Sequence, residues 1–174
     1  MKNKRFLLRT IATFSLGILM MGCNNSQTNS SNDKALEVSI NKEDSQKILH
    51  AYLELKDALV QTNGAKAQEA AKNLFKAIEG EDHEEIVVKI KTSAKHISET
   101  TETDVQRSHF NSLSNNVYSL IKASKSNDGK IYKQYCPMAM NNKGAFWLSA
   151  EEEVNNPYFG DMMLHCGSVK EVLD

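Results

Sequence analysis

The sequence predicts a mainly α-helical fold: an antiparallel four-helix bundle over residues 35–126, followed by a small, irregular and partly β lobe over residues 127–174. Two observations carry this prediction. Four segments repeat apolar residues at helical spacing, and that periodicity is lost after the turn signal Asn127-Asp128-Gly129. With 174 residues, 40% of them hydrophobic and 25% charged, the chain has the composition of a globular domain. Its formal net charge of −1 provides no basic field, so we expect no nucleic-acid partner.

Residues 1–22 have the features of a bacterial export signal. A basic start precedes the apolar run Ile11–Gly22, which is too short to span a bilayer. The run ends in Met20-Met21-Gly22-Cys23, which resembles a bacterial lipoprotein box, whose cysteine is lipidated. We therefore expect a lipidated Cys23, a flexible polar tether over residues 23–34 and a membrane anchor. Asn24 and Asn25 after the cysteine carry no aspartate retention signal, which in a two-membrane host favours the outer membrane, facing the periplasm. Ordinary secretion with an incidental Cys23 is the alternative.

The four predicted helices each carry one apolar stripe. The first is expected to end at Asn63-Gly64 and the second at Gly80. Capping boxes predict that the third starts at Asp82, with Glu85 three residues on, and the fourth at Thr103, with Gln106. Such stripes bury themselves by packing on one another, which favours a bundle. The stripes are Ile48, Tyr52, Leu55, Leu59; Ala67, Ala71, Leu74, Ile78; Ile86, Ile90, Ala94, Ile97; and Phe110, Leu113, Val117, Leu120.

The segment 127–174 has a different character. It contains four of the seven methionines, the single tryptophan and both prolines. Short extended pieces are predicted around Ile131–Tyr135, at Ala145–Leu148 and at Met162–Leu164, with turns at residues 142–144 and 156–157. We expect this segment to form a lobe that packs on the helices as part of the same globular domain.

The candidate chemistry lies in two sulfur-rich stretches of this lobe. In an extended chain, Cys136, Met138 and Met140 share one face because side chains alternate. The second stretch contains Met162, Met163, His165 and Cys166. If it is extended, Met162 shares a face with Cys166; if it is helical, both methionines reach Cys166. Thiolates and thioethers are soft donors that select Cu(I), whereas zinc sites use more cysteine or histidine.

Two other interpretations of the same residues stay open. Methionine clusters often fill irregular cores. Cys136 and Cys166 are also placed to form a structural disulfide in an exported protein. Such a bond across about 30 residues stabilises a fold by roughly 3–4 kcal/mol in the chain-entropy model. It would consume both thiolates.

Four segments of the chain resemble a family of uncharacterised bacterial envelope domains. They are residues 104–121 (DVQRSHFNSLSNNVYSLI), 132–139 (YKQYCPMA), 144–149 (GAFWLS) and 156–167 (NPYFGDMMLHCG). The resemblance covers about residues 36–173, and Tyr-Cys-Pro-Met is also similar to a heavy-metal-binding motif of copper transporters. Such domains are common in Bacteroidetes, as small lipoproteins or beside periplasmic adaptors of copper and heavy-metal efflux pumps.

The resemblance implies a metal site and a class of partner. It points to Cys136, Met138, Met163 and Cys166 as metal ligands, with His165 and Met140 beside them. It implies structural roles for Gly144, Trp147, Asn156, Pro157, Tyr158 and Gly160. A periplasmic adaptor of a metal efflux pump is the partner that it implies.

The remaining candidates are a histidine and an aromatic patch. His109, near the apolar face of the fourth helix, is a further candidate ligand if it turns toward the lobe. No enzyme motif is present, so we expect no catalytic activity. The alternative function is a structural interaction module, stapled by a Cys136–Cys166 disulfide. It would dock a partner through Phe146, Trp147, Tyr158 and Phe159.

Overall fold

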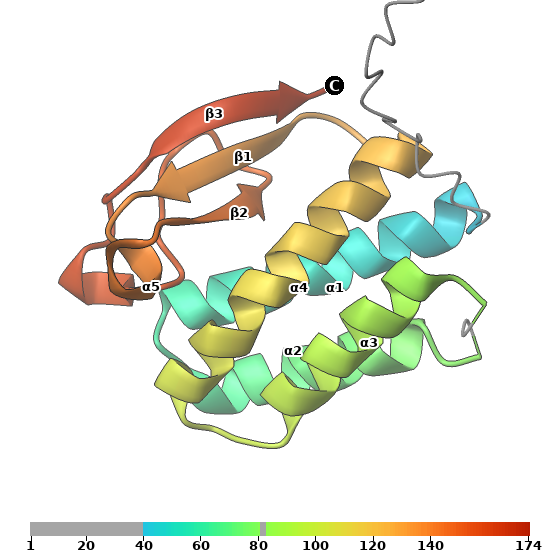
Figure 1. The fold of residues 1–174 in the computed structure, drawn as a ribbon, viewed down its shortest axis with the longest axis horizontal. Coiled ribbons are helices and arrows are strands. Elements are labelled where there is room, and N and C mark those ends of the chain that lie inside the picture. The colour runs from blue at the N-terminus through green and yellow to red at the C-terminus, as the bar shows by residue number, and fades with distance from the viewer. Residues whose placement is uncertain (1–39, 81–82) are drawn as a thin grey trace, which may run out of the picture. The chain divides into compact units, whose positions relative to one another are not determined.

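The structure, a computed structural model, describes residues 40–80 and 83–174 (Figure 1). The predicted export signal of residues 1–22, the lipidation site Cys23 and the tether of residues 23–34 lie outside these described residues. Most of the described chain is helical, and a three-stranded antiparallel sheet follows at its C-terminal end. The prediction of a mainly helical chain that changes character near residue 130 is therefore confirmed. No helix in residues 40–80 and 83–174 combines the length and apolarity needed to cross a membrane.

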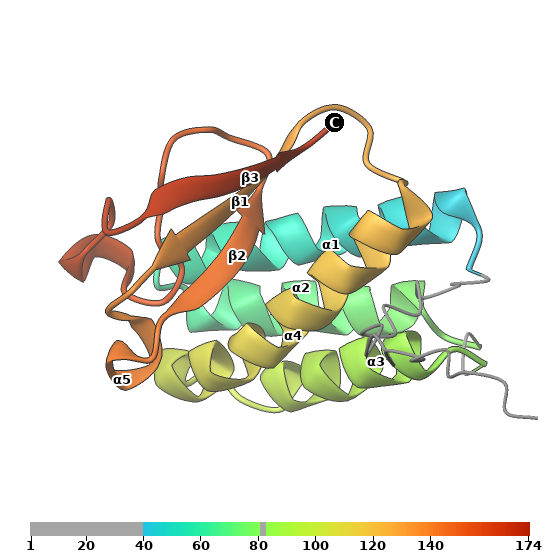
Figure 2. The ribbon, with the colours of Figure 1, turned by 45° about the horizontal axis from the view of Figure 1, so that its top comes forward.

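Four long helices make up the first part of the described chain. They are α1 (Lys42–Val60), α2 (Gly64–Ala77), α3 (Glu85–Ser98) and α4 (Thr103–Ser124). Each helix packs on the next, and α1 also packs on α4 (Figures 1 and 2). Every residue of the four predicted stripes is buried. Apolar periodicity therefore predicted both the helices and the faces that they bury.

The turn between α1 and α2 differs from the prediction. Asn63-Gly64 begins α2 instead of ending α1, because the Asn63 side chain accepts a hydrogen bond from the Lys66 amide at 3.0 Å. Thr62 takes the left-handed conformation instead, with φ 52°. Gly64 is needed for close approach, since a Cβ there would lie 1.8 Å from the Thr101 carbonyl oxygen.

The two predicted capping boxes are wrong. Helix α3 begins at Glu85 after the N-cap Glu84, and Asp82 lies outside the described residues. Helix α4 begins at Thr103, but its N-cap is Glu102, with no side-chain cap hydrogen bond. The buried Gln106 instead donates to the Gly64 carbonyl at 2.9 Å and to the Thr100 carbonyl at 2.8 Å. The Gln106 side-chain amide therefore links the start of α2 to the turn before α4 and does not cap α4.

The C-terminal lobe is built on the sheet order β2-β1-β3. Its elements are β1 (Ile131–Cys136), the short turn α5 (Ala139–Asn142), β2 (Ala145–Ser149), the 3-10 turn η1 (Gly160–Met162) and β3 (Ser168–Leu173). The first two predicted strands are thus confirmed, but Met162–Leu164 is not a strand. Gly160 and Asp161 start a 3-10 turn there, with the Met163 amide bonded to the Gly160 carbonyl at 3.2 Å.

The lobe and the helices share one core. Tyr52 of α1 stacks on Phe110 of α4 at a ring-centroid distance of 5.2 Å. Phe110 in turn contacts Tyr158 at 5.7 Å, and Tyr158 contacts the fully buried Trp147 of β2 at 6.0 Å. This continuous run of aromatic rings fixes the position of β2 against α1 and α4.

Candidate functional site

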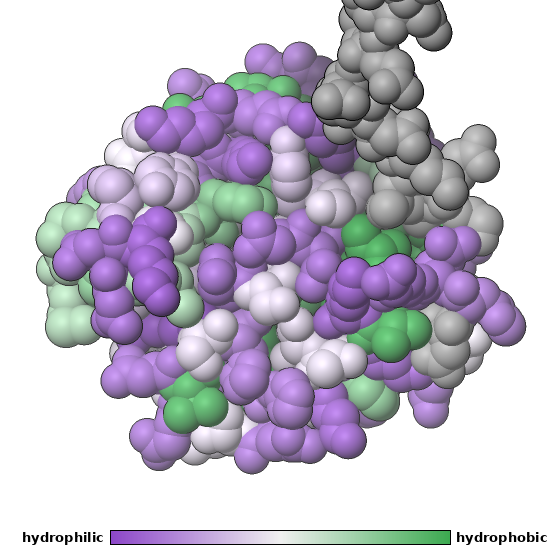
Figure 3. All heavy atoms as spheres, in the orientation of Figure 1, coloured by the Kyte–Doolittle hydropathy of each residue, from purple (hydrophilic) through white to green (hydrophobic). Residues whose placement is uncertain are grey.

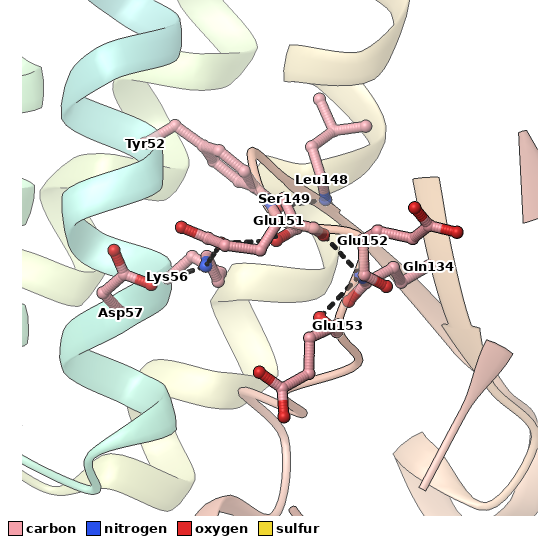
Figure 4. Close-up of polar contacts among 9 residues, drawn as sticks. All are labelled: Tyr52, Lys56, Asp57, Gln134, Leu148, Ser149, Glu151, Glu152 and Glu153. Atoms are coloured by element: carbon pink, nitrogen blue, oxygen red, sulfur yellow. Dashed lines mark hydrogen bonds and ion pairs between the residues drawn. The ribbon is translucent and has the colours of Figure 1, made fainter. Parts of the chain in front are cut away.

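Polar contacts from α1 fasten the lobe to the helices (Figure 4). The Tyr52 hydroxyl, fully buried, accepts a hydrogen bond from the Leu148 amide of β2 at 3.1 Å and contacts the Ser114 hydroxyl at 2.8 Å. Burial raises the pKa of Tyr52, so the phenol stays neutral. One turn further on, the buried Lys56 ammonium lies 3.1 Å from the Glu151 carboxylate. The sequence pattern did not predict that Lys56 is buried, although Lys56 lies on the same helical face as Tyr52 and Leu59.

Gln134 of β1 holds the acidic turn that follows β2 (Figure 4). Its buried amide nitrogen donates to the carbonyl oxygens of Glu151, Glu152 and Glu153, at 2.9, 3.2 and 3.0 Å. The three glutamate side chains are exposed. The turn is therefore a structural connection whose backbone is held by Gln134 and whose acidic side chains face solvent.

The two lobe cysteines meet at one end of the sheet. Cys136 is the last residue of β1, and Cys166 lies two residues before β3. The antiparallel register pairs Tyr135 with Ser168, so the chain enters β3 beside the end of β1. The two Sγ atoms lie 2.7 Å apart, and both thiols are free. Cys136 is fully buried and Cys166 half-buried, which leaves the pair one accessible side.

Asn156 positions the segment that carries Cys166. This fully buried side chain donates to the Cys166 carbonyl at 2.8 Å and accepts from the Tyr158 amide at 2.8 Å. Its own amide donates to the Leu164 carbonyl at 2.7 Å. Asn156 thus closes the loop from residue 156 to residue 166 and holds the backbone of Cys166 toward β1.

The neighbouring thiol changes the acidity of Cys166. Its hydrogen bond with Cys136 raises the pKa of the Cys166 thiol, and desolvation and the charge of a Cys136 thiolate act in the same direction. Two adjacent thiols resist carrying two negative charges. A cation shared between the sulfurs removes that repulsion, so metal binding and loss of thiol protons are coupled at this pair.

Three of the predicted methionine ligands gather around a separate pocket. Met138, Met140 and Met163 line a cavity of about 460 Å³, together with Asp104, Arg107, Ser108, Asn141, Asn142, Tyr158 and Phe159. Neither cysteine is among these lining residues. The structure therefore brings Met138 and Met163 together with Met140, and it brings Cys136 together with Cys166.

An unusual backbone turn positions Met140. Met140, Asn141 and Asn142 are three consecutive residues with positive φ, at 52°, 58° and 63°. A residue with a β-carbon pays about 1–2 kcal/mol for this conformation, although asparagine tolerates it better. Gly144 ends the turn with φ 79°, and a Cβ there would lie 1.9 Å from the Tyr135 hydroxyl. The turn is thus packed tightly on β1, with the Met140 side chain at the pocket.

The other predicted ligands lie elsewhere. Met162 is 75% exposed and does not line the pocket. The exposed His165 ring donates from Nδ1 to the Val154 carbonyl at 2.9 Å. His109 stacks on His96 of α3 at 4.7 Å, and burial followed by the His96 charge lowers its pKa. Among the described residues, no three His, Cys, Asp or Glu side chains form a group suited to a metal ion.

The four residues of the predicted interaction patch are mostly interior. Trp147 is fully buried and Tyr158 is 6% exposed, while Phe146 and Phe159 are half-buried. The Tyr158 hydroxyl donates to the Phe146 carbonyl at 2.9 Å. Trp147 and Tyr158 therefore serve the core that joins β2 to α4, and they offer little surface to a partner.

The helical part of the chain matches a known protein family. Residues 48–129 match the family described as a protein of unknown function, DUF3347. This range runs from within α1 to the turn before β1, so it ends before the two lobe cysteines and before Met138, Met140 and Met163. The DUF3347 description names no activity, and searches of curated proteins and of solved structures gave no significant match.

Proposed function

We propose that this protein binds a soft metal ion, Cu(I), at the Cys136–Cys166 pair. The observation that carries the proposal is the contact of two free thiols from separate segments, with Sγ atoms 2.7 Å apart. Thiolates are among the softest protein ligands, and they favour Cu(I) over hard cations. The pair has one buried and one half-exposed member, which suits capture of an ion from solution and its later release.

The cellular setting belongs to the same proposal. A lipidated Cys23 would anchor the protein in the envelope, on the periplasmic side of the outer membrane in a two-membrane host. There it would buffer Cu(I) or hand it to the periplasmic adaptor of an efflux pump. The scaffold that we propose is an up-and-down antiparallel four-helix bundle, supported by the packing of each helix on the next.

The test is a Cu(I) titration against a competing chelator, under anaerobic reducing conditions. We expect tight binding by the wild-type protein and its loss in Cys136→Ser and in Cys166→Ser, with far-UV circular dichroism unchanged. Cys23→Ser is the matched control, because it removes the remaining cysteine of the chain and should leave the affinity unchanged. Absence of bound copper in the reduced wild-type protein would overturn the proposal.

The same thiol contact favours a second candidate function, a structural module of the envelope stapled by a Cys136–Cys166 disulfide. The two residues are 30 positions apart, and their sulfurs are already adjacent. Counting free thiols in native protein, before any reductant is added, separates the two candidates. Two reactive lobe thiols support the metal site, whereas complete blockage without metal supports the staple.

A further inference from the structure

We infer that Met138, Met140 and Met163 form a second soft-metal site, built from thioethers alone, which takes one univalent ion of the Cu(I) or Ag(I) type. This inference goes beyond the dithiol proposal and does not depend on it. The three methionines come from two segments, the turn α5 with the residue before it and the residue after η1. Their convergence on one pocket is produced by the fold, since more than 20 residues separate Met140 from Met163.

Met138 and Met163 do not pack on the hydrophobic core, and Met140, which packs on it in part, also lines the pocket. Met138 is 46% exposed, and Met140 and Met163 are half-buried, so the thioethers line a pocket of about 460 Å³ that remains reachable. Figure 3 shows a moderately hydrophobic surface patch over α5 and η1, at the left of the view. A methionine recruited only to fill a core would be enclosed by apolar neighbours. These three instead share their pocket with Asp104, Arg107 and two asparagines.

The backbone at Met140 supports the same assignment. The left-handed turn of Met140–Asn142 is sparsely populated for a methionine, and such strain persists where surrounding structure imposes it. Gly144 and the Tyr135 ring lock the turn against β1. Met140 has a left-handed backbone conformation and Met138 a right-handed one. The turn nevertheless brings both side chains to the same pocket. The site is therefore preorganised on its α5 side.

The charges at the pocket allow a univalent cation. Arg107 is held by hydrogen bonds to the Pro157 carbonyl at 2.9 Å, the Leu59 carbonyl at 3.3 Å and the Thr62 hydroxyl at 3.0 Å. Its guanidinium also lies 3.5 Å from the Asp104 carboxylate, which offsets its charge. The lining residues include no thiol and no imidazole. Zn(II) and Cu(II), which are bound mainly through imidazole nitrogen, thiolate or several carboxylates, find a single carboxylate here, that of Asp104, and are therefore poor occupants.

Thioethers differ from thiols in two properties that matter for the exported setting proposed above. They carry no proton, so an ion binds them without proton release, and they do not form disulfides. The pocket therefore retains its ligands when Cys136 and Cys166 are oxidised. The thioether site would therefore bind soft ions whether the cysteines are oxidised or reduced, and the dithiol site only when they are reduced.

The experiment is a titration of the purified protein with Ag(I) nitrate, an ion that does not change oxidation state, observed through the [13C]methyl resonances of methionine. The reference protein carries Cys23→Ser, because a Cys23 thiol would itself bind Ag(I). With the lobe thiols reduced, we expect two equivalents bound by this reference and one by the triple variant Met138→Leu/Met140→Leu/Met163→Leu. Leucine nearly conserves the side-chain volume and removes the thioether donor. Met162→Leu is the matched control, because Met162 is exposed and outside the pocket, and it should still bind two equivalents.

The cysteines are tested separately, so that failure of either proposal can be recognised. Cys136→Ser/Cys166→Ser should keep one equivalent of Ag(I), with shifts at the Met138, Met140 and Met163 methyl groups and no proton release. If the double variant fails to fold, the wild-type methyl shifts still decide. Unmoved resonances of these three methionines in the wild-type protein, or a triple variant that binds as much Ag(I) as the wild type, would overturn the inference. A cysteine variant that binds no Ag(I), together with a triple methionine variant that binds as much as the wild type, would leave only the dithiol site.

Discussion

Replacing Tyr52 by phenylalanine should destabilise the connection between the helices and the sulfur-bearing lobe. The Tyr52 hydroxyl is buried and serves two partners, the Ser114 hydroxyl at 2.8 Å and the Leu148 amide at 3.1 Å. Strand β2 is an edge strand, with β1 on one side only, so no further strand replaces the hydroxyl as partner of that amide. A buried donor left unsatisfied costs about 1–3 kcal/mol. We therefore expect Tyr52→Phe to lower the free energy of unfolding by about 2 kcal/mol.

Urea denaturation followed by two signals tests this reasoning. Trp147, the single tryptophan, reports on β2 through fluorescence, and far-UV circular dichroism reports on the helices. Because the two parts share a core, both signals should move together in the wild-type protein and in the variant. The control is Ser114→Ala: in a double-mutant cycle it should couple to Tyr52→Phe, by about 1 kcal/mol. A Tyr52→Phe variant within about 0.5 kcal/mol of wild type, or separate transitions for the two signals, would refute the argument.

Three further predictions concern the turns and the thiol pair. Gly64→Ala should lower the free energy of unfolding by about 2–3 kcal/mol in thermal or urea denaturation, because its Cβ would meet the Thr101 carbonyl at 1.8 Å. The rate of Cys166 alkylation should rise with pH around a midpoint above that of an ordinary cysteine, since Cys136 raises the Cys166 pKa. Cys136→Ser should lower that midpoint, and an unchanged midpoint would contradict the contact. Asn156→Ala should cost about 2–3 kcal/mol in urea denaturation and speed Cys166 alkylation at fixed pH, because the segment holding Cys166 loses both side-chain hydrogen bonds. Equal alkylation rates would show that Asn156 does not hold that segment.

Features that local sequence patterns determine could be predicted, whereas features that depend on tertiary contacts could not. The buried faces of the four helices followed from apolar spacing, because core packing is the dominant force on an amphipathic helix. The helix ends did not follow, since Asn63 caps the next helix and Gln106 donates to the distant Gly64 carbonyl and to the Thr100 carbonyl of the preceding turn. Strand β3 was missed because Ser168–Leu173 contains Lys170 and Glu171, and its inner face is only half-buried. There, Glu171 accepts a hydrogen bond from Tyr118 of α4 at 2.6 Å, a contact that no local pattern encodes.

The sulfur residues show the same limit at the candidate site. Composition identified the donors, and alternation predicted that Cys136, Met138 and Met140 share one face of an extended chain. Strand β1 instead ends at Cys136, and the backbone at Met140 is left-handed. Cys136 is therefore separated from Met138 and Met140. The partner of each donor is then set by sheet register: β3 returns beside β1 and delivers Cys166 to Cys136.

This division has a chemical consequence for how the lobe would handle metal. Two adjacent thiols bind a cation in competition with protons and with disulfide formation, so their affinity depends on pH and on redox conditions. Three thioethers have neither dependence, but they supply no negative charge and so hold an ion less tightly. An ion captured at the exposed methionine pocket would therefore move toward the dithiol when the thiols are reduced, and would stay exchangeable when they are oxidised. If both proposed sites bind metal, the oxidation state of Cys136 and Cys166 sets the direction in which an ion moves between the methionine pocket and the dithiol pair.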